Sequence, residues 1–507
     1  MTSPRTNLVP ALEAILGASR VFSDPTACAS YGVYEIVPSV VAKPSSSEEV
    51  AEIVRFAALE KLALIPCGAR TKLRIGMPPT RYDIALVMTA LNQIVHYDPG
   101  DLTLSVGAGT SIAKLNATLL EHRQFLPLLV PWYSLSTIGG TIASGIDSPL
   151  RQFYGTARDF LIGAEFVTGS GAITKSGGRV VKNVTGYDLH KLLIGSLGTL
   201  AVITRLNFRT FPAPIAGSRG FVASFPTAEA ALALRHAISQ SPLTPLTFDI
   251  VSPGLAKIFY EKTPATPETA VFSGEHQKAS DHSLPSIGTW FHPSEWQLCA
   301  AFAGPAEVLD RYTRNLLGLA EQSHATSTAL LDDLTRPSLW GRLRETLSLL
   351  LESSTATTIF KLSVLPSHHA ALFTDLQQIA DRAGLPHALL ARASGTMYFA
   401  LLPASTNDET TARLAQVSAQ VFDATLASAG DPTLLFAPPS FNQAVNIWHD
   451  FSVRRKSPPA KMNSVSAKSR SRLDVRSQPL ETGQSLSSRL KTAFDPHGVF
   501  ASGRLLT

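Results

Sequence analysis

The sequence predicts an α+β protein that is divided into more than one domain. Its 507 residues exceed the size of an ordinary single domain. A composition of 45% hydrophobic and 16% charged residues is typical of a globular chain with a sizeable core. Short apolar runs alternate with amphipathic segments from about Val37 onward, which indicates strands alternating with helices. We therefore expect packed α+β domains.

The elements of the first half follow in chain order after an N-terminal helical segment, residues 1–37. Ser46, three residues before Glu49, predicts a capping box and hence a helix in SSSEEVAEIVRFAALEKL. Buried strands are predicted in ALIP and IALVM, and two strands joined by a Pro-Gly turn in IVHYDPGDLTLSVGAGT. A helix in SIAKLNATLLEHR, a hairpin in FLIGAEFVTGSGAIT, a short helix in LHKLLIG and a strand in LAVITRLNF complete this domain, residues 38–212.

Repeated strand–helix units predict a second α+β domain over residues 213–450. Their arrangement favours an antiparallel or mixed sheet covered by helices. Residues 263–288 are rich in Pro, Thr and Ser and are predicted to form a mobile loop. A basic Ser/Pro-rich linker follows at 451–485, and a C-terminal segment at 486–507 closes the chain.

Charge and cysteine content exclude several function classes. The net charge of +5 comes from residues 454–476, which hold eight basic side chains and one acid, so the remainder gives no basic surface for nucleic acid. Cys28, Cys67 and Cys299 are too far apart in sequence for a disulfide framework or an iron–sulfur motif. There is no signal-peptide core, and no apolar run of about 18 residues that could span a bilayer. A cytoplasmic location is expected.

Four glycine-bearing segments in the first domain suggest a site for an anionic ligand. They are PCGARTKL, VGAGTS, STIGGTIASG and GSLGTLAVIT. Each is predicted at a strand end or a loop-to-helix junction, where glycine lets the backbone approach a ligand closely. None matches a P-loop or the G-x-G-x-x-G dinucleotide pattern, so each alone is also compatible with an ordinary turn.

These segments, in this order, resemble the FAD-binding domain of the vanillyl-alcohol-oxidase, or PCMH-type, flavoproteins. GGRVVKNVTGYDLHKLLIGSLGTLAVITRLNFRTFP, YGTARDFLIGAEFVTGSG and FDPHGVFASGRL most resemble the FAD-binding (E) subunit of bacterial glycolate oxidase. The resemblance implies an FAD-binding domain of two α+β subdomains with a C-terminal α+β cap domain. The cofactor residues that it implies are Pro66, Gly68, Ala69, Arg70, Thr71, Ser136, Thr137, Gly139, Gly140, Gly198, Thr199, Val202 and Arg504.

Several positions depart from the family pattern. Arg70 stands where the family usually has a third glycine, so it either pairs with the FAD diphosphate or weakens binding through its bulk. Thr71 occupies the place of the flavin-linking histidine of covalent relatives, which implies non-covalent FAD. Leu197 replaces the Glu of the catalytic (D) subunit, which favours the E-type assignment.

No catalytic residue is identified with certainty. Lys182, Asn183 and Tyr187 are candidates near the flavin, although Tyr187 is equally compatible with packing against the cap. Arg392 is a fourth candidate, because ARASGTMYF aligns with the strand on which D-type relatives carry metal-binding histidines.

The histidines of this chain are not expected to bind a metal. With Arg392 and Phe399 at the histidine places of the D-type motif, no metal is expected. His368 and His369 are predicted to be exposed at a helix start, and His190 and Lys191 on a solvated helix face.

Two functions remain open. One is an FAD-dependent oxidoreductase subunit that oxidises a small 2-hydroxy acid, glycolate or lactate, by hydride transfer to flavin N5. The other is a non-catalytic FAD-holding subunit that assembles a separate catalytic chain. Both imply a D-type flavin subunit and an iron–sulfur subunit as partners, and peripheral membrane association would arise only through them.

Overall fold

Most of the chain is described by the computed structural model. The described residues are 8–179, 186–213, 217–262, 291–332, 335–439, 441, 486–501 and 503–504. Lys182, Asn183, the loop 263–288 and the linker 451–485 lie outside the described residues. Among the helices of the described ranges, none combines the length and apolar character that crossing a bilayer requires.

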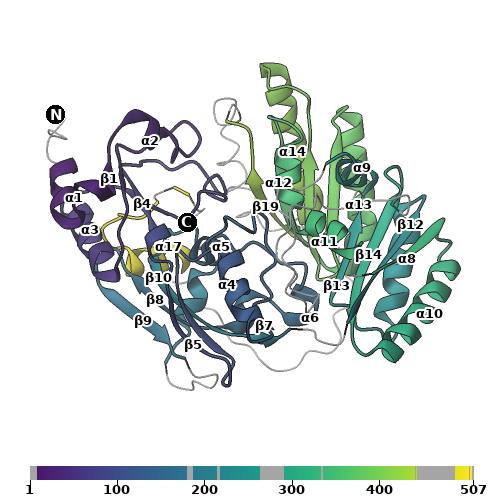
Figure 1. Ribbon diagram of the computed structural model, residues 1–507. Coiled ribbons are helices and arrows are strands. Elements are labelled where there is room, and N and C mark those ends of the chain that lie inside the picture. The colour runs from purple at the N-terminus through teal and green to yellow at the C-terminus, as the bar shows by residue number, and fades with distance from the viewer. Residues whose placement is uncertain are drawn as a thin grey trace, which may run out of the picture.

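The first subdomain, purple in Figure 1, is built on a four-stranded sheet with strand order β1-β2-β4-β3. Strands β2, β3 and β4 run parallel, and β1 pairs antiparallel with β2. The strands are β1 (Val21–Phe22), β2 (Val40–Ala42), β3 (Leu64–Cys67) and β4 (Ile84–Val87), and the helices are α1 (Leu8–Leu16), η1 (Ala18–Arg20), α2 (Pro25–Ala29), α3 (Ser47–Leu59) and η2 (Met88–Ala90). The predicted strands in ALIP and IALVM are confirmed as β3 and β4.

Helix α3 begins where the sequence predicts. The Ser46 hydroxyl accepts a hydrogen bond from the Glu49 amide at 3.1 Å, which caps the helix. The Glu49 carboxylate, however, accepts from the Ser45 amide and pairs with Arg20 at 2.7 Å. Only half of the predicted capping box therefore forms.

The second subdomain is an antiparallel five-stranded sheet with strand order β5-β6-β10-β8-β9. The predicted Pro-Gly turn joins β5 to β6, and the predicted hairpin is β8–β9. The strands are β5 (Ile94–Asp98), β6 (Thr103–Gly107), β8 (Leu161–Val167), β9 (Ile173–Gly177) and β10 (Val202–Arg209), with a small pair β7 (Gln124–Phe125) and β11 (Phe211–Pro212). The helices are α4 (Ile112–Leu120), α5 (Ile138–Ser144), α6 (Arg151–Tyr154), α7 (Ala157–Phe160) and the 3₁₀ turn η3 (Leu189–Leu193).

The cap domain contains an eight-stranded antiparallel sheet with strand order β15-β12-β14-β13-β17-β18-β16-β19. Its strands are β12 (Ser218–Phe225), β13 (Thr247–Val251), β14 (Trp296–Ala303), β15 (Ser327–Leu331), β16 (Thr358–Ser363), β17 (His387–Arg392), β18 (Thr396–Leu401) and β19 (Asp431–Phe436). One face packs on α8 (Ala228–Ser239), α10 (Ala306–Gln322), α13 (His369–Arg382) and α14 (Asp408–Ala427). The other face packs on α9 (Pro253–Glu261), α11 (Arg336–Arg344) and α12 (Thr346–Leu351). A turn η4 (Pro366–His368) precedes α13.

The cap and the second subdomain share one apolar core. Ile142 and Phe208 of the second subdomain belong to the same buried cluster as Trp340 and Tyr398 of the cap. Glu345, between α11 and α12, adds a polar link, because its carboxylate accepts hydrogen bonds from the amides of Trp132 and Tyr133. Burial of this shared apolar surface fixes the cap against the first half of the chain.

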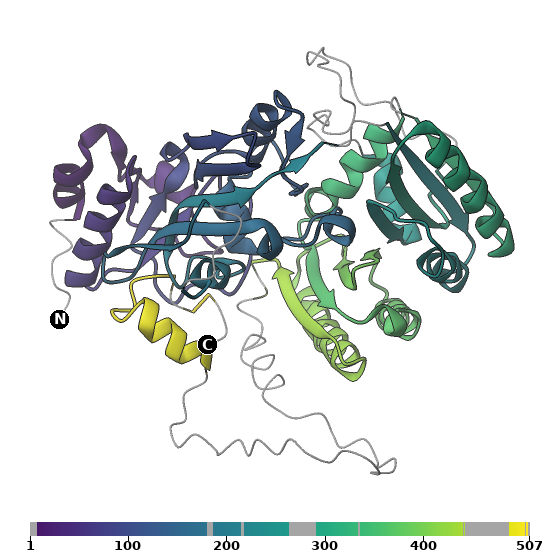
Figure 2. The ribbon, with the colours of Figure 1, turned by 90° about the horizontal axis from the view of Figure 1, so that it is seen from below.

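Residues after the linker return to the first half of the molecule. Figure 2 shows helix α17 (Leu486–Phe494), in yellow, beside the N-terminal half. Phe494 stacks on Phe166 with ring centroids 6.0 Å apart. The chain beyond α17 pairs with β3, since the Leu64 amide donates to the Val499 carbonyl at 2.8 Å. This pairing extends the first sheet with a segment that is remote in sequence.

Two of the predicted exposed histidines are buried, and those predictions were wrong. His190 is 2% exposed because LHKLLIG forms a 3₁₀ turn that directs the ring toward Ser176, at 3.0 Å. His369 is fully buried against Phe373, and Arg235 contacts its Nδ1 at 2.6 Å. In both cases a polar partner that is distant in sequence stabilises the buried ring.

Candidate functional site

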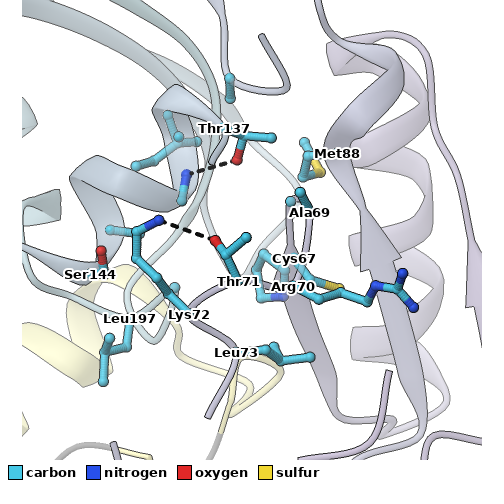
Figure 3. A pocket seen from close by; sticks show the side chains of 18 of the residues that line it. Cys67, Ala69, Arg70, Thr71, Lys72, Leu73, Met88, Thr137, Ser144 and Leu197 are labelled. Carbon is cyan, nitrogen blue, oxygen red and sulfur yellow. Dashed lines mark hydrogen bonds between the residues drawn. The ribbon is translucent and has the colours of Figure 1, made fainter. Parts of the chain in front are cut away.

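A cavity opens where the end of β3 meets the N-terminus of α5 (Figure 3). It contains about 750 Å³ of space free of protein atoms, part of it open to solvent, which is in the range of small-molecule and cofactor sites. Ten of the thirteen predicted cofactor residues line it: Pro66, Gly68, Ala69, Arg70, Thr71, Thr137, Gly139, Gly140, Gly198 and Arg504. The sequence therefore locates most of this cavity.

The loop after β3 lines the cavity and contains unpaired amides. Within the described residues, the amide groups of Gly68, Ala69, Arg70 and Thr71 donate no hydrogen bond. Arg70 has φ 66°, in the left-handed region that usually favours glycine. Successive amides in such a turn form a concave site that suits an anion.

The N-terminus of α5 forms the opposite wall. Thr137 caps the helix, and its hydroxyl accepts from the Gly140 amide at 3.3 Å (Figure 3). Gly139 is required for close packing, because a Cβ there would lie 2.7 Å from the Ala108 Cβ. A Cβ at Gly68 would likewise overlap the Thr137 side chain. Small residues thus allow the two loops to approach each other.

The fourth glycine-bearing segment, GSLGTLAVIT, contributes only in part. Gly198, with φ 70°, packs on Pro66 and lines the cavity beside Leu197. Thr199 is buried and donates to the Ser196 carbonyl at 2.7 Å, and Val202 is buried in β10. Neither of these two predicted residues lies in the cavity wall. Ser136, the remaining predicted residue, is fully buried behind the wall.

Arg504 closes the cavity from the returning C-terminal segment. It is 3% exposed, and its guanidinium donates to the carbonyl oxygens of Leu73 and Ile75. Its Nε has no hydrogen-bond partner among the described residues. A buried guanidinium with an unused donor suits a cavity whose ligand carries negative charge.

The charge of the lining is positive. Arg70, Lys72 and Arg504 line the cavity, and its described lining contains no Asp or Glu. Lys72 and Arg504, together with the four unpaired amides, fit the diphosphate of a dinucleotide cofactor such as FAD. Lys72 was not among the predicted cofactor residues, although it lies within the glycine-bearing segment PCGARTKL, directly after Thr71. Its place in that segment was the available signal.

Arg70 directs its side chain away from the ligand space. Its guanidinium lies over the Tyr31 ring, 4.8 Å from the centroid, and donates to the Ser30 carbonyl at 3.1 Å. Figure 3 shows it on the side opposite Lys72. This conformation therefore does not support the pairing of Arg70 with the diphosphate, which was one of the two roles that the sequence allowed.

We expect Arg70→Gly to be tolerated. Glycine relieves left-handed strain of roughly 1–2 kcal/mol, which offsets the lost contact with Tyr31, worth about 0.5–1 kcal/mol. The free energy of unfolding should change by no more than about 1 kcal/mol, and FAD should still bind. Arg70→Ala is the matched control, because it loses the same contact but keeps the strain. Urea denaturation showing the glycine variant to be the less stable of the two would contradict the prediction.

Arg392 lies in the cap sheet and does not line the cavity. It is 5% exposed, and its Nη1 donates to both Asp249 carboxylate oxygens at 3.0 and 3.1 Å. Asp147 of the first half of the chain lies 3.6 Å from its Nε. A catalytic role for Arg392 stays a prediction, and this geometry supports a role in joining the two halves of the molecule.

The structure places none of the other catalytic candidates, Lys182, Asn183 and Tyr187, in the cavity wall described above. Tyr187 is 89% exposed, and Lys182 and Asn183 lie outside the described residues. Among the described residues, no group of three or more His, Cys, Asp or Glu side chains is placed to hold a metal ion. The expectation of no metal ligand stays a prediction.

Comparisons with known proteins agree with this geometry. Residues 38–177 match the family described as FAD binding domain, and residues 218–433 match that of the FAD linked oxidases, C-terminal domain. The fold is similar to that of p-cresol methylhydroxylase with substrate bound, with a TM-score of 0.71 and 15% identity over 98% of this chain and 95% of that one.

Two curated relatives match over part of their length. Glycolate oxidase subunit GlcE of Escherichia coli (strain K12) is 36% identical over 33% of this chain and 48% of its own length. D-lactate dehydrogenase of Archaeoglobus fulgidus is 36% identical over 34% of this chain and 39% of its own length. The matched regions thus span less than half of either relative.

The two family matches follow each other along the chain as the two halves of the fold do. The cavity between its glycine-bearing loops lies in the half that matches the FAD binding domain. The chain therefore belongs to the FAD-linked oxidases, with a PCMH-type FAD-binding fold and FAD as its cofactor.

Proposed function

We propose that this chain is an FAD-binding oxidoreductase subunit, with non-covalent FAD, of an assembly that oxidises a small 2-hydroxy acid. The observation that supports it is a cavity whose described lining contains no Asp or Glu and includes four adjacent residues with unpaired amides. The relatives that match the chain are named for glycolate oxidase and D-lactate dehydrogenase. When bound, FAD supplies the hydride-accepting chemistry that such an oxidation needs.

The residues of this chain bind and shield the cofactor. The amides of the loop after β3 and the cations Lys72 and Arg504 hold the diphosphate. Met88, Ala201 and Ile203 give the cavity apolar walls that keep water from the bound group. Thr71, at the place of the flavin-linking histidine in covalent relatives, has a hydroxyl that forms no such bond, so FAD stays exchangeable.

Partners complete the proposal. A D-type flavin subunit and an iron–sulfur subunit would receive the electrons, since the three cysteines of this chain are buried and separate. The match to glycolate oxidase subunit GlcE supports a multi-subunit assembly of this kind.

The test uses the purified full-length chain reconstituted with FAD. We expect one tightly but reversibly bound FAD, released intact on denaturation. Under anaerobic conditions, glycolate or D-lactate should bleach the visible flavin absorption once the co-expressed partner subunits are present. A chain that takes up no FAD, or a complete assembly that neither acid reduces, would overturn the proposal.

A second candidate is an assembly subunit that never turns over itself. The pairing of Arg392 with Asp249 favours it, because that guanidinium is not available to a substrate carboxylate. The same experiment separates the two functions. Bleaching of the isolated chain by either acid would contradict the assembly role, and bleaching confined to the partner's flavin would support it.

A further inference from the structure

Lys72 is a buried cation in the cavity wall. It is 8% exposed, and its ammonium donates to the hydroxyls of Ser136 and, at 3.1 Å, of Thr71 (Figure 3). The Trp132 ring lies beside it, with its centroid 5.6 Å from Nζ. Both hydroxyls belong to segments that border the cofactor cavity, so Lys72 joins the two loops at the site.

No carboxylate neutralises Lys72 within the described residues. Glu345 is the acid that acts on it, but the Glu345 oxygens accept from the amides of Trp132 and Tyr133 and from Arg344 Nε. A buried ammonium whose only hydrogen-bond partners are hydroxyls is costly unless an anion reaches it.

The other cations of the lining are already occupied in part. Arg70 extends to Tyr31 and Ser30, and Arg504 donates to backbone carbonyls. Lys72 differs from both arginines in that its ammonium donates to hydroxyls and to no backbone carbonyl among the described residues.

We propose that Lys72 is a cofactor-binding residue whose ammonium compensates one charge of the FAD diphosphate, so that FAD binding takes up a proton. The diphosphate is the charged part of oxidised FAD. This inference rests on FAD binding and is independent of the substrate and of the partner subunits.

The sign of the pH dependence follows from burial. Burial lowers the pKa of Lys72 to about 7, and Glu345 opposes that shift. Below that pKa, the ligand-free protein already carries the ammonium, so FAD affinity should be independent of pH. Above it, the lysine is neutral before binding and must gain a proton, so affinity should fall about tenfold per pH unit.

Other ionisable groups around Lys72 do not explain such a profile. Burial raises the pKa of Cys67 to about 12, above the relevant range. The other charged groups nearby are the guanidinium groups of Arg70, Arg504 and Arg344 and the carboxylate of Glu345.

The experiment titrates FAD into the full-length protein stripped of its cofactor, from about pH 6 to about pH 9. The dissociation constant, measured by flavin fluorescence, should be about 100-fold larger at the upper end. Lys72→Met should bind more weakly at about pH 6 and show no slope, and Lys72→Arg should bind tightly without a slope, because arginine stays charged. Lys114→Met, which removes an exposed lysine, is the matched control and should behave as wild type.

Calorimetry gives a second readout that needs no variant. At about pH 8, FAD binding in two buffers of different ionisation enthalpy should reveal uptake of about one proton. A wild-type affinity that does not change with pH, or a methionine variant that keeps the slope, would overturn the role of Lys72. Failure to bind FAD at every pH would instead refute the cofactor assignment itself.

Discussion

Gly139→Asp should yield a protein without flavin. The new carboxylate would stand at the N-terminus of α5, on the cavity wall that we assign to the diphosphate. At about 4 Å and an effective dielectric constant of about 20, repulsion between two unit charges is about 4 kcal/mol, or roughly a thousandfold in affinity. The measurement is the flavin-to-protein ratio after purification, followed by FAD titration.

Controls separate charge from size. A Cβ at Gly139 would lie 2.7 Å from the Ala108 Cβ and 2.9 Å from its carbonyl oxygen, so Gly139→Ala should cost about 1–3 kcal/mol of stability but keep measurable FAD affinity. Gly140→Asp introduces the charge where a Cβ meets only Thr137 Oγ1, at 3.0 Å, and should also lose FAD. Full flavin content in both aspartate variants would show that α5 does not border the diphosphate.

Asp249→Leu should destabilise the protein by about 3–5 kcal/mol, because it leaves the Arg392 guanidinium buried without its main partner. The free energy of unfolding in urea measures the loss. Asp310→Leu is the surface control: Asp310 pairs with Arg219 at a similar distance, 3.0 Å, but its side chain is 59% exposed, so the change should cost less than about 1 kcal/mol.

The double variant Asp249→Leu/Arg392→Met completes the cycle. Removing both charges should recover most of the stability that Asp249→Leu loses, since an apolar pair of similar volume costs little. If the double variant is no more stable than the single one, Arg392 is held by contacts other than Asp249, among which Asp147 is the first to examine.

Local patterns predicted the elements and most of the cavity wall. Strands β3 and β4 and the hairpin β8–β9 follow from short apolar runs and their turns, and the glycine loops follow from a resemblance in sequence. The helix α5 is capped by Thr137 within the predicted STIGGTIASG segment. These features depend on neighbours within a few residues, which a single sequence contains.

Contacts between distant residues could not be predicted. Arg392 and Asp249 face each other because β13 and β17 are adjacent strands, a pairing across 143 residues. The burial of His369 depends on Arg235 of another helix. Lys72 turns inward because Ser136, 64 residues away, offers it a hydroxyl. The direction of these side chains and their pairing depend on which strands and helices become neighbours in the folded chain, and local sequence patterns do not give that order.

The return of the C-terminal segment to β3 also has a consequence for biosynthesis. Arg504 covers a loop whose Leu73 carbonyl lies 431 positions earlier in the chain. While the ribosome is still making the cap, the emerging polypeptide holds the glycine loops without this cover and without the Val499 pairing to Leu64. Stable flavin capture is thus expected only after translation has passed residue 504, and prematurely terminated chains should be colourless.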